Sequence, residues 1–290
     1  TGYRAFYLMK YEISQIQYVE FLNTLTRTQQ ISRTAIQDSG YYAMTGDSVV
    51  VDRNGIRVSS APASGPFVFG CDLNRNGVMN ETSDGTAIAA NYMSWQDIAA
   101  YLDWSALRPY TELEFEKAAR GPETPLTGAF VWGDLSAETE NYKGLDNAGT
   151  ESEIVSNPLA NVHASPQGVG GPIRVGSFAQ SGTSRSQAGA GYYGNLDLGG
   201  NLWEIVISIG NSVGRGFTGS HGDGELDANG DANVSGWPPV NTTVKLGKRG
   251  APYVGSTNEA KIANRNYSNR SFYQGQRRYF DGCRGAHSAY

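Results

Sequence analysis

Helical patterning ends near residue 121, and this limit constrains the fold more than any other feature of the sequence. From there to the C-terminus, Gly, Asn and Ser alternate with short apolar segments. The 37 Gly and 17 Tyr of this 290-residue chain are typical of irregular backbone held in place by large side chains. Because helices come first and short strands with loops follow, we predict a single α+β domain over residues 1–290.

Three segments carry the apolar spacing and the end signals of helices: residues 14–26, 91–107 and 107–121. Each contains a Ser or Thr that can cap the free backbone N–H groups of a helix start. Gly121, followed by Pro122, ends the third segment. The predicted N-caps, with their capping-box partners where present, are Ser14, Ser94 with Asp97, and Thr111 with Glu114.

Two segments predict strands. Residues 5–11 are rich in aromatic side chains, and residues 49–58 (VVVDRNGIRV) surround an Asn-Gly pair. Asn-Gly is the strongest short signal for a two-residue hairpin turn. We therefore expect a hairpin that reverses at Asn54 and Gly55.

Charge and apolarity exclude some classes of partner. A net charge of −5 and a pI near 5.3 provide no basic field, so we expect no nucleic-acid partner. No run of about 18 apolar residues occurs, so we expect no membrane span. Cys71 and Cys283 are the two cysteines, and their spacing leaves open whether they form a disulfide or stay buried thiols.

Short motifs follow one another through almost the whole chain. They are YEISQIQYVEFLN (11–23), MSWQDIAAYLDW (93–104), LRPYTELEFEKAARG (107–121), FVWGD (130–134), RVGSF (174–178), YYGNLDLGGNLWEIV (192–206), KRGAPY (248–253) and DGCRGA (281–286). In this order they resemble the formylglycine-generating enzyme, or sulfatase-modifying factor, family. The resemblance implies a C-type-lectin-like fold with two main helices, small twisted sheets and many ordered loops. The family's N-terminal strand has no match, which implies that the domain belongs to a longer precursor.

The resemblance also implies that this chain lacks the family's catalysis. Oxygen-using members bind copper through two cysteines about five residues apart, and the matching positions here are Thr257 and Ile262, which cannot form thiolates. Related iron enzymes need clustered histidines, whereas His163, His221 and His287 are scattered without ligand spacing. We therefore expect neither copper nor iron.

Residues 72–84 (DLNRNGVMNETSD) predict a calcium site. Oxygen ligands at alternate positions can surround one hard cation, and a glycine at the sixth position allows the sharp turn of an EF-hand-type loop. Ser83 stands where such loops carry an acid. The alternative is a polar hairpin whose Asn and Asp residues merely favour turns. The predicted ligands are Asp72, Asn74, Asn76, Asn80 and Asp84.

A second calcium site is implied by the resemblance. In relatives, the Asn and Glu of a Gly-Asn-x-Trp-Glu motif bind a structural calcium; in GGNLWEIV (199–206) these residues are Asn201 and Glu204, with Trp203 filling the core beneath. The alternative is an ion pair between Glu204 and a core arginine such as Arg249. A patch similar to the family's other calcium loop comprises Asn141, Tyr142 and Asn157.

Residues 264–281 interleave asparagines, aromatic residues and arginines, a composition that suits adaptable binding surfaces. In lectin-fold proteins diversified by retroelements, the similar region is the variable ligand-binding face. The alternative is that these aromatic residues pack the closing strands. The candidate ligand-binding residues are Asn264, Asn266, Tyr267, Asn269, Phe272, Tyr273, Tyr279 and Phe280.

These features favour a non-catalytic binding or structural module on a calcium-stabilised lectin-like scaffold, secreted or displayed at the cell surface. Its partner would be a protein, a glycan or further copies of itself. Two alternatives stay open: a divergent oxidoreductase of the formylglycine-generating family, and a retroelement-diversified ligand-binding protein whose variable face spans 264–281. No pair of nucleophile and base supports the first alternative.

Overall fold

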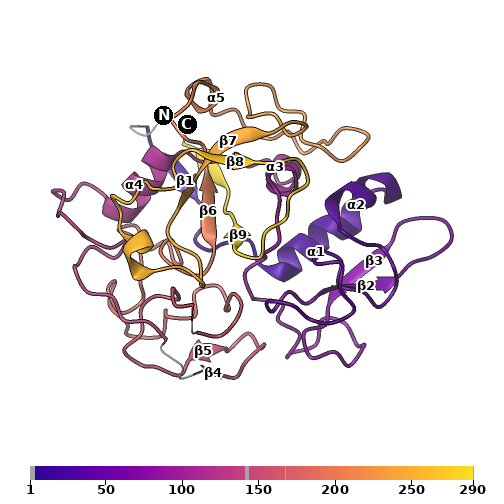
Figure 1. Ribbon diagram of the computed structural model, residues 1–290, viewed down its shortest axis with the longest axis horizontal. Coiled ribbons are helices and arrows are strands. Elements are labelled where there is room, and N and C mark those ends of the chain that lie inside the picture. The colour runs from indigo at the N-terminus through magenta and orange to yellow at the C-terminus, as the bar shows by residue number, and fades with distance from the viewer. Residues whose placement is uncertain (1–3, 141–143, 167, 290) are drawn as a thin grey trace.

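A four-stranded sheet lies at the centre of the molecule (Figure 1). The computed structural model describes residues 4–140, 144–166 and 168–289. β6 pairs antiparallel with β7 and parallel with β9, and β7 pairs antiparallel with β8. The sheet thus has the order β8-β7-β6-β9, formed by β8 (Arg270–Phe272), β7 (Val244–Arg249), β6 (Trp203–Val206) and β9 (Asp281–Gly282). The GGNLWEIV turn therefore delivers its Trp and Glu into an inner strand.

The two ends of the chain meet beside this sheet (Figure 1). β1 (Phe6–Leu8) pairs antiparallel with β10 (Ala286–Ser288), with Phe6 opposite Ser288. The strand predicted within residues 5–11 is therefore confirmed. Its partner is the C-terminal segment, so the fold closes on itself.

The three predicted helices are confirmed as α1 (Gln15–Thr24), α3 (Trp95–Trp104) and α4 (Glu112–Arg120). Each begins with a capping box, in which the cap side chain accepts the N3 backbone N–H and the N3 side chain accepts the cap N–H. Gly121 ends α4 with a φ of +65°, a backbone conformation that favours glycine.

A further helix, α2 (Arg27–Arg33), follows α1 directly. Its capping box joins Thr26 and Gln29, but the segment RTQQISR has one large apolar residue, so no amphipathic pattern predicted it. In the second half of the chain, the described helical elements are the single turns α5 (Ser212–Arg215) and the 3₁₀ helix η1 (Thr257–Ala260). This part is loop-rich, as predicted.

The predicted hairpin at Asn54 and Gly55 is wrong. The turn lies two residues earlier, because Asp52 and Arg53 take the positive φ values of +47° and +57° between the paired residues Val51 and Asn54. Asn54 is instead fully buried and its side chain binds Asn91 (2.9 Å), so it serves the core rather than the turn. The real hairpin partners are β2 (Ile56–Ser60) and β3 (Val68–Cys71), and a second small pair joins β4 (Leu145–Asp146) to β5 (Ile154–Val155).

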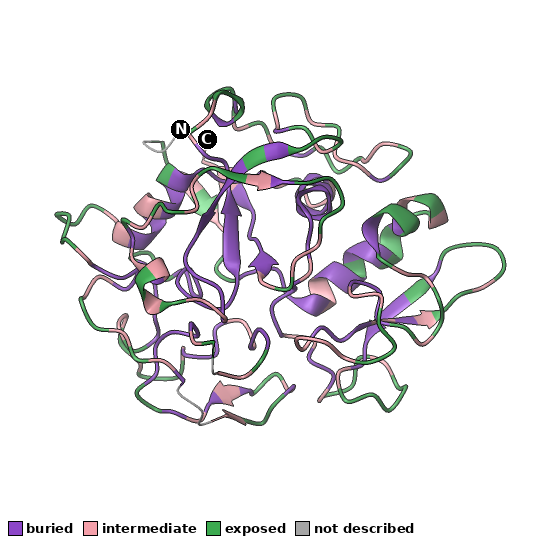
Figure 2. Cartoon of the chain, viewed as in Figure 1, coloured by how far each residue is buried: buried purple, intermediate pink, exposed green. Residues whose placement is uncertain are grey.

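The core forms on both sides of the central sheet, whose inner strand β6 is buried along its whole length (Figure 2). The larger apolar cluster joins α1, α3, β2 and β3 to Trp203 and Ile205 of β6. A second cluster places Phe115 of α4 against Val206 and Leu198. β6 thus contacts both halves of the molecule, and its four residues are all buried.

Cys71 and Cys283 lie within the larger cluster as free, buried thiols. The structure therefore resolves the question of pairing in favour of two unpaired cysteines.

No helix in the described ranges is long and apolar enough to span a membrane.

The turn into β6 requires glycine at position 200. Gly200 has a φ of +94°, and a Cβ there would lie 2.8 Å from the Val162 side chain and 2.9 Å from the backbone nitrogen of His163. Any other residue would therefore have to adopt an unfavourable backbone conformation, and its Cβ would clash with the His163 backbone.

We expect Gly200→Ala to lower the free energy of unfolding by at least about 3 kcal/mol, because left-handed strain and overpacking add. Gly219→Ala is the matched control, since Gly219 has a φ of +81° but no atom lies within 4 Å of the place that its added methyl group would take. The free energy of unfolding of this control should fall by about 1 kcal/mol. Urea unfolding measures both variants, and equal losses would contradict a packing role for Gly200.

Candidate ligand-binding groove and the corner that supports it

The Glu204 carboxylate lies in a fully buried ion pair with Arg284. Arg284 Nε donates to Glu204 Oε1 at 2.5 Å, and the Tyr110 hydroxyl donates to Oε2 at 2.9 Å. Both members of the pair have 0% exposed side chains. The alternative of an ion pair with a core arginine is therefore realised with Arg284, whereas Arg249 lies 3.7 Å from Glu112 and 3.4 Å from Glu116.

The Asn201 side chain is also occupied by protein contacts. Its Nδ2 donates to Glu12 Oε2 at 2.6 Å, and its Oδ1 accepts the Ile173 N–H at 2.9 Å. Glu12 further accepts the backbone N–H of Leu202 at 3.1 Å. A calcium ion at Asn201 and Glu204 would have to displace Arg284 or Glu12 from these contacts, and the site stays a prediction.

Three buried carboxylates surround the single guanidinium of Arg284. Burial raises the pKa of Glu12 well above its usual range, and the neighbouring Asp197 and Glu204 raise it further. Burial also raises the pKa of Asp197 to about 6, although Gly176 N–H donates to this carboxyl at 2.6 Å and Arg284 opposes the rise. Arg174 also opposes the rise at Asp197, but the three carboxylates still outnumber the one guanidinium of Arg284 that lies among them.

A cavity of about 220 Å³ opens at the edge of the central sheet, next to this corner. Its floor comes from β6 and β7, and its walls come from the loops on either side of β8. We call it the aromatic–basic groove. It is lined by Trp203, Lys248, Pro252, Val254, Gly255, Glu259, Tyr267, Arg270, Arg278 and Phe280.

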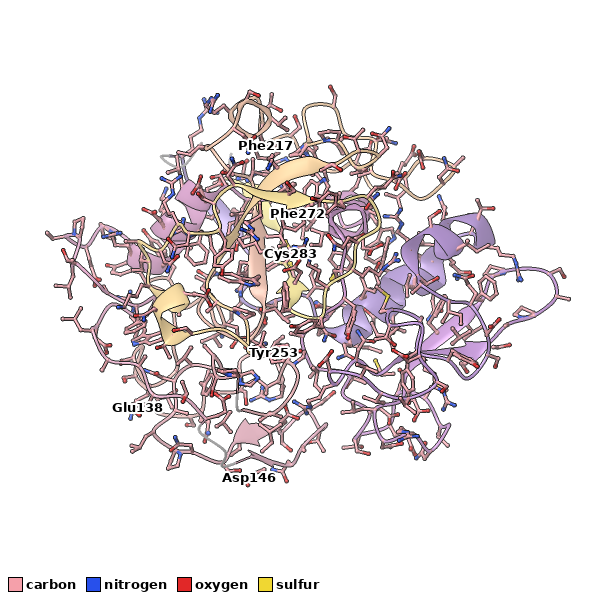
Figure 3. All side chains as sticks on the ribbon, viewed as in Figure 1. Glu138, Asp146, Phe217, Tyr253, Phe272 and Cys283 are labelled. Carbon is pink, nitrogen blue, oxygen red and sulfur yellow. The ribbon has the colours of Figure 1, made fainter. Side chains whose placement is uncertain are left out.

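The groove continues into a second hollow of about 580 Å³. The two share Val254, Gly255 and Glu259. Figure 3 labels Phe272 and Cys283 within the central sheet region and Tyr253 at its lower end, below the same strands. A ligand longer than one residue or one sugar therefore has a continuous surface to follow.

Aromatic rings and cations alternate on the groove walls. Trp203 and Tyr267 lie with ring centroids 4.8 Å apart. The Arg270 guanidinium lies 5.2 Å from the Tyr267 ring centroid, and Lys248 Nζ lies 4.6 Å from that of Phe280. These contacts hold the cations in place over the rings.

Lys248 is the most buried cation of the groove. Its Nζ donates to the Asp281 carboxylate, and both side chains are almost fully buried. Burial lowers the pKa of Lys248 to about 8, although Asp281 opposes the change. Arg270 and Arg278 add positive charge, whereas Glu259 is the one acid among the lining residues.

The predicted ligand-binding residues of 264–281 take different positions relative to the groove. Tyr267 and Phe280 line the groove, Tyr273 and Tyr279 are exposed outside it, and Phe272 is buried beneath it at 5% exposure. The predicted asparagines mainly bind one another and the backbone: Asn264 Oδ1 accepts the Asn266 N–H, and Asn269 Oδ1 accepts from Asn211. Both interpretations of this segment are thus partly realised, since some aromatic residues pack and others face solvent.

Sequence reasoning missed Trp203, Lys248, Arg270 and Arg278 as groove residues. The sequence could have indicated Arg270 and Arg278 as binding residues, because they lie among the aromatic residues of 264–281. Lys248 and Trp203 come from distant strands, and the pairing of β6 with β7 brings them to the groove.

In the 72–84 loop, the predicted ligands lie at the end of β3. Asp72 and Asp84 are fully buried, whereas Asn74, Asn76 and Asn80 are exposed. Asn80 Oδ1 accepts the Cys71 N–H at 2.8 Å, so this side chain faces the strand. Across the described residues, no three His, Cys, Asp or Glu side chains are grouped to hold a metal.

Of the remaining predicted patch, Asn141 and Tyr142 lie outside the described residues. The Asn157 amide donates to the Thr139 carbonyl at 2.9 Å.

The family of the chain follows from a comparison with known domains. The Sulfatase-modifying factor enzyme 1-like domain matches residues 1–279. The chain therefore belongs to this family, and the resemblance stated from its motifs is confirmed. The family's C-type-lectin-like fold agrees with the few helices and small sheets described above, so the predicted α+β class is also confirmed.

Among solved structures, PvdO from Pseudomonas aeruginosa is similar, with a TM-score of 0.42 and 16% sequence identity. The alignment covers 98% of this chain and 80% of PvdO. No curated protein sequence matches the chain significantly.

We expect Glu204→Gln to lower the free energy of unfolding by about 3–5 kcal/mol, because Arg284 would lose the charged carboxylate to which its buried guanidinium donates directly. The matched control is Glu123→Gln, whose carboxylate pairs with Arg185 but is 48% exposed. That change should cost less than about 1 kcal/mol. Chemical denaturation measures the free energy of unfolding of both variants. A decrease for Glu204→Gln as small as that of the control would show that the buried ion pair does not stabilise the fold.

The raised pKa of Asp197 predicts a dependence of stability on pH. Its folded pKa of about 6 exceeds the ordinary value of 3.8, so the folded chain retains a proton that the unfolded chain releases between these values. Stability from this group is present at low pH and is lost as pH rises from about 4 to 6, by roughly 2–3 kcal/mol.

Asp197→Asn removes this titration, and Asn tolerates the positive φ of +58° at the position. The variant should therefore become more stable relative to the parent as pH rises from 4 to 7. Urea unfolding at a series of pH values measures the difference, and a difference independent of pH would contradict the assignment.

Proposed function

We propose that this member of the sulfatase-modifying factor enzyme 1-like family is a non-catalytic binding module, and that its ligand site is the aromatic–basic groove. The proposal depends on which side chains line this cavity and on where the cavity lies. Three cations and three aromatic rings line a single cavity, beside the segment in which the family's oxygen-using members are expected to hold their cysteine pair.

The cysteines of this chain support a non-catalytic role. Thr257 lines the adjoining hollow and Ile262 is buried, so neither expected thiol position offers sulfur. Cys71 and Cys283 lie in the core, where burial raises the pKa of Cys71 to about 12 and that of Cys283 above its usual range. Thiols protonated in this way are poor copper ligands.

The histidines do not form the kind of cluster that related iron enzymes need to bind their metal. His221 and His287, described as scattered from the sequence, are brought together with ring centroids 4.0 Å apart. The rings are stacked, and His221 Nε2 accepts the Ser288 N–H at 2.9 Å, so the pair does not aim its nitrogens at a shared ion. His163 lies elsewhere, against the buried Glu140 at 3.0 Å.

The chemistry of the groove favours an anionic ligand with a flat or apolar portion. Arg270 and Arg278 can donate to a carboxylate or sulfate at the groove walls. Trp203, Tyr267 and Phe280 offer ring surface to the rest of the ligand. The volume of about 220 Å³ suits one acidic side chain or one acidic sugar.

Several parts of the sequence interpretation stay predictions. These are a secreted or cell-surface location, self-association, and the retroelement-diversified alternative, for which the exposed Tyr273 and Tyr279 would supply variable contacts. The oxidoreductase alternative is an outcome of the same experiments: copper-dependent turnover of a cysteine-containing peptide would establish it and overturn the non-catalytic role.

We expect Arg270→Gln and Arg278→Gln each to weaken binding of an anionic probe by roughly 10- to 100-fold, since a charge-assisted hydrogen bond contributes about 1.5–3 kcal/mol. Calorimetric titration with an oligogalacturonate, a sulfated oligosaccharide and an acidic peptide, each beside its neutral counterpart, identifies the source of the anion.

Arg215→Gln is the matched control, because Arg215 is exposed and lies outside the lining of the groove. This variant should bind like the parent chain. If no anionic probe binds, or if the control weakens binding equally, the groove is not the proposed site.

A further inference from the structure

The loop 72–84 contains two buried carboxylates that protein groups only half satisfy. Asp72 and Asp84 are both 0% exposed. Asp72 Oδ1 and Asp84 Oδ1 find no hydrogen-bond partner in the described part of the chain. A buried oxygen without a donor is costly, and more so on a charged group.

Each carboxylate uses its other oxygen to shape the loop. Asp72 Oδ2 accepts the Gly77 N–H at 3.2 Å and pairs with Arg57. Asp84 Oδ2 accepts the Glu81 N–H at 2.7 Å. The two acids are thus held by opposite ends of the loop, and each leaves one oxygen free.

The two acids also influence each other. Both carboxylates are fully buried within one loop, so the negative charge of each makes it more costly to bury the other. Arg57 neutralises one charge at most, because its other hydrogen bond goes to the Gly40 carbonyl at 2.8 Å. The pair therefore lacks a positive charge next to its free oxygens.

Two side-chain amide oxygens of the same loop can add to the oxygen donors for a hard cation. Asn74 and Asn76 stand two and four residues after Asp72, and their Oδ1 atoms accept the N–H groups of Asn76 (2.9 Å) and Val78 (2.7 Å). These bonds turn the loop back towards Asp72, and an oxygen that accepts one N–H keeps a lone pair for a metal.

We propose that the 72–84 loop binds one calcium ion through the carboxylates of Asp72 and Asp84, with Asn74 and Asn76 as further oxygen ligands. Calcium accepts six to eight oxygens in flexible geometry, whereas magnesium demands a near-ideal octahedron that this loop does not preform. Asn80, predicted as a ligand from spacing, instead secures the end of β3. Asp84 serves as the terminal acid, one residue later than in an EF-hand loop.

The ion would tie the end of β3 to the segment that follows Asp84. That segment contacts a distant part of the chain, because the Gly85 N–H donates to the Gly149 carbonyl at 2.8 Å. Calcium at this loop would therefore stabilise the contact between the β2–β3 hairpin and the 145–155 region. This role does not depend on the proposed ligand of the aromatic–basic groove.

The test is calorimetric titration of the EDTA-treated full chain with calcium chloride, beside magnesium chloride. The parent chain should bind calcium with a Kd between about 10⁻⁶ and 10⁻³ M and show a higher Tm with calcium than without. Asp84→Asn should bind one calcium ion fewer, or bind it at least about tenfold more weakly. Its metal-free Tm should equal or exceed that of the metal-free parent, because the repulsion between the two acids is gone.

Two further variants keep the result interpretable. Asn76→Ala changes an exposed side chain and should weaken the same calcium-binding event without unfolding the chain. Asp38→Asn changes an exposed acid outside the loop and should leave calcium binding unchanged. The proposal is overturned if the parent binds no calcium, or if Asp84→Asn and Asn76→Ala both bind as many ions at the parent's affinity.

Discussion

The buried pair of Glu204 and Arg284 is the interaction on which the rest of the structure depends. Glu204 lies in the inner strand of the central sheet, and Arg284 lies in the segment that returns to close the molecule. Arg284 also donates to the Met9 and Lys10 carbonyls at 3.3 and 3.0 Å, so one guanidinium joins the start, the centre and the end of the chain. Because a buried charge must be paired, these three segments cannot separate without a large loss of free energy.

This constraint also places the groove. With β6 fixed by its ion pair, β7 and β9 are aligned on either side of it. Lys248 of β7 and Asp281 of β9 then pair across the intervening strand β6, and Trp203 presents its ring beside Tyr267. On this scaffold, the groove presents cations that are held in place over aromatic rings. A stable corner and an adaptable loop surface can therefore vary independently.

Much of the fold was predictable where signals are local. The capping boxes at Ser14, Ser94 and Thr111 fixed three helix starts, since a cap and its partner lie within one turn of each other. The motif order identified the family across residues 1–279. The Asn54-Gly55 hairpin failed because turn propensity competes with burial, and the core used the Asn54 amide as a hydrogen-bonding group. The alternative of a core arginine as the partner of Glu204 was correct in kind, but the partner is Arg284 and not Arg249, although Arg249 lies opposite Glu204 in the β6–β7 ladder.

The sequence by itself determined the family, the α+β class and the helix starts. These depend on residue identity and on spacing within a few positions. Only the tertiary structure decided that Arg284 pairs with Glu204 and that Lys248 and Trp203 join Tyr267 in one groove. Such groupings join segments far apart in the chain, and no local pattern encodes them, because packing and the pairing of buried charges select among many possible long-range contacts.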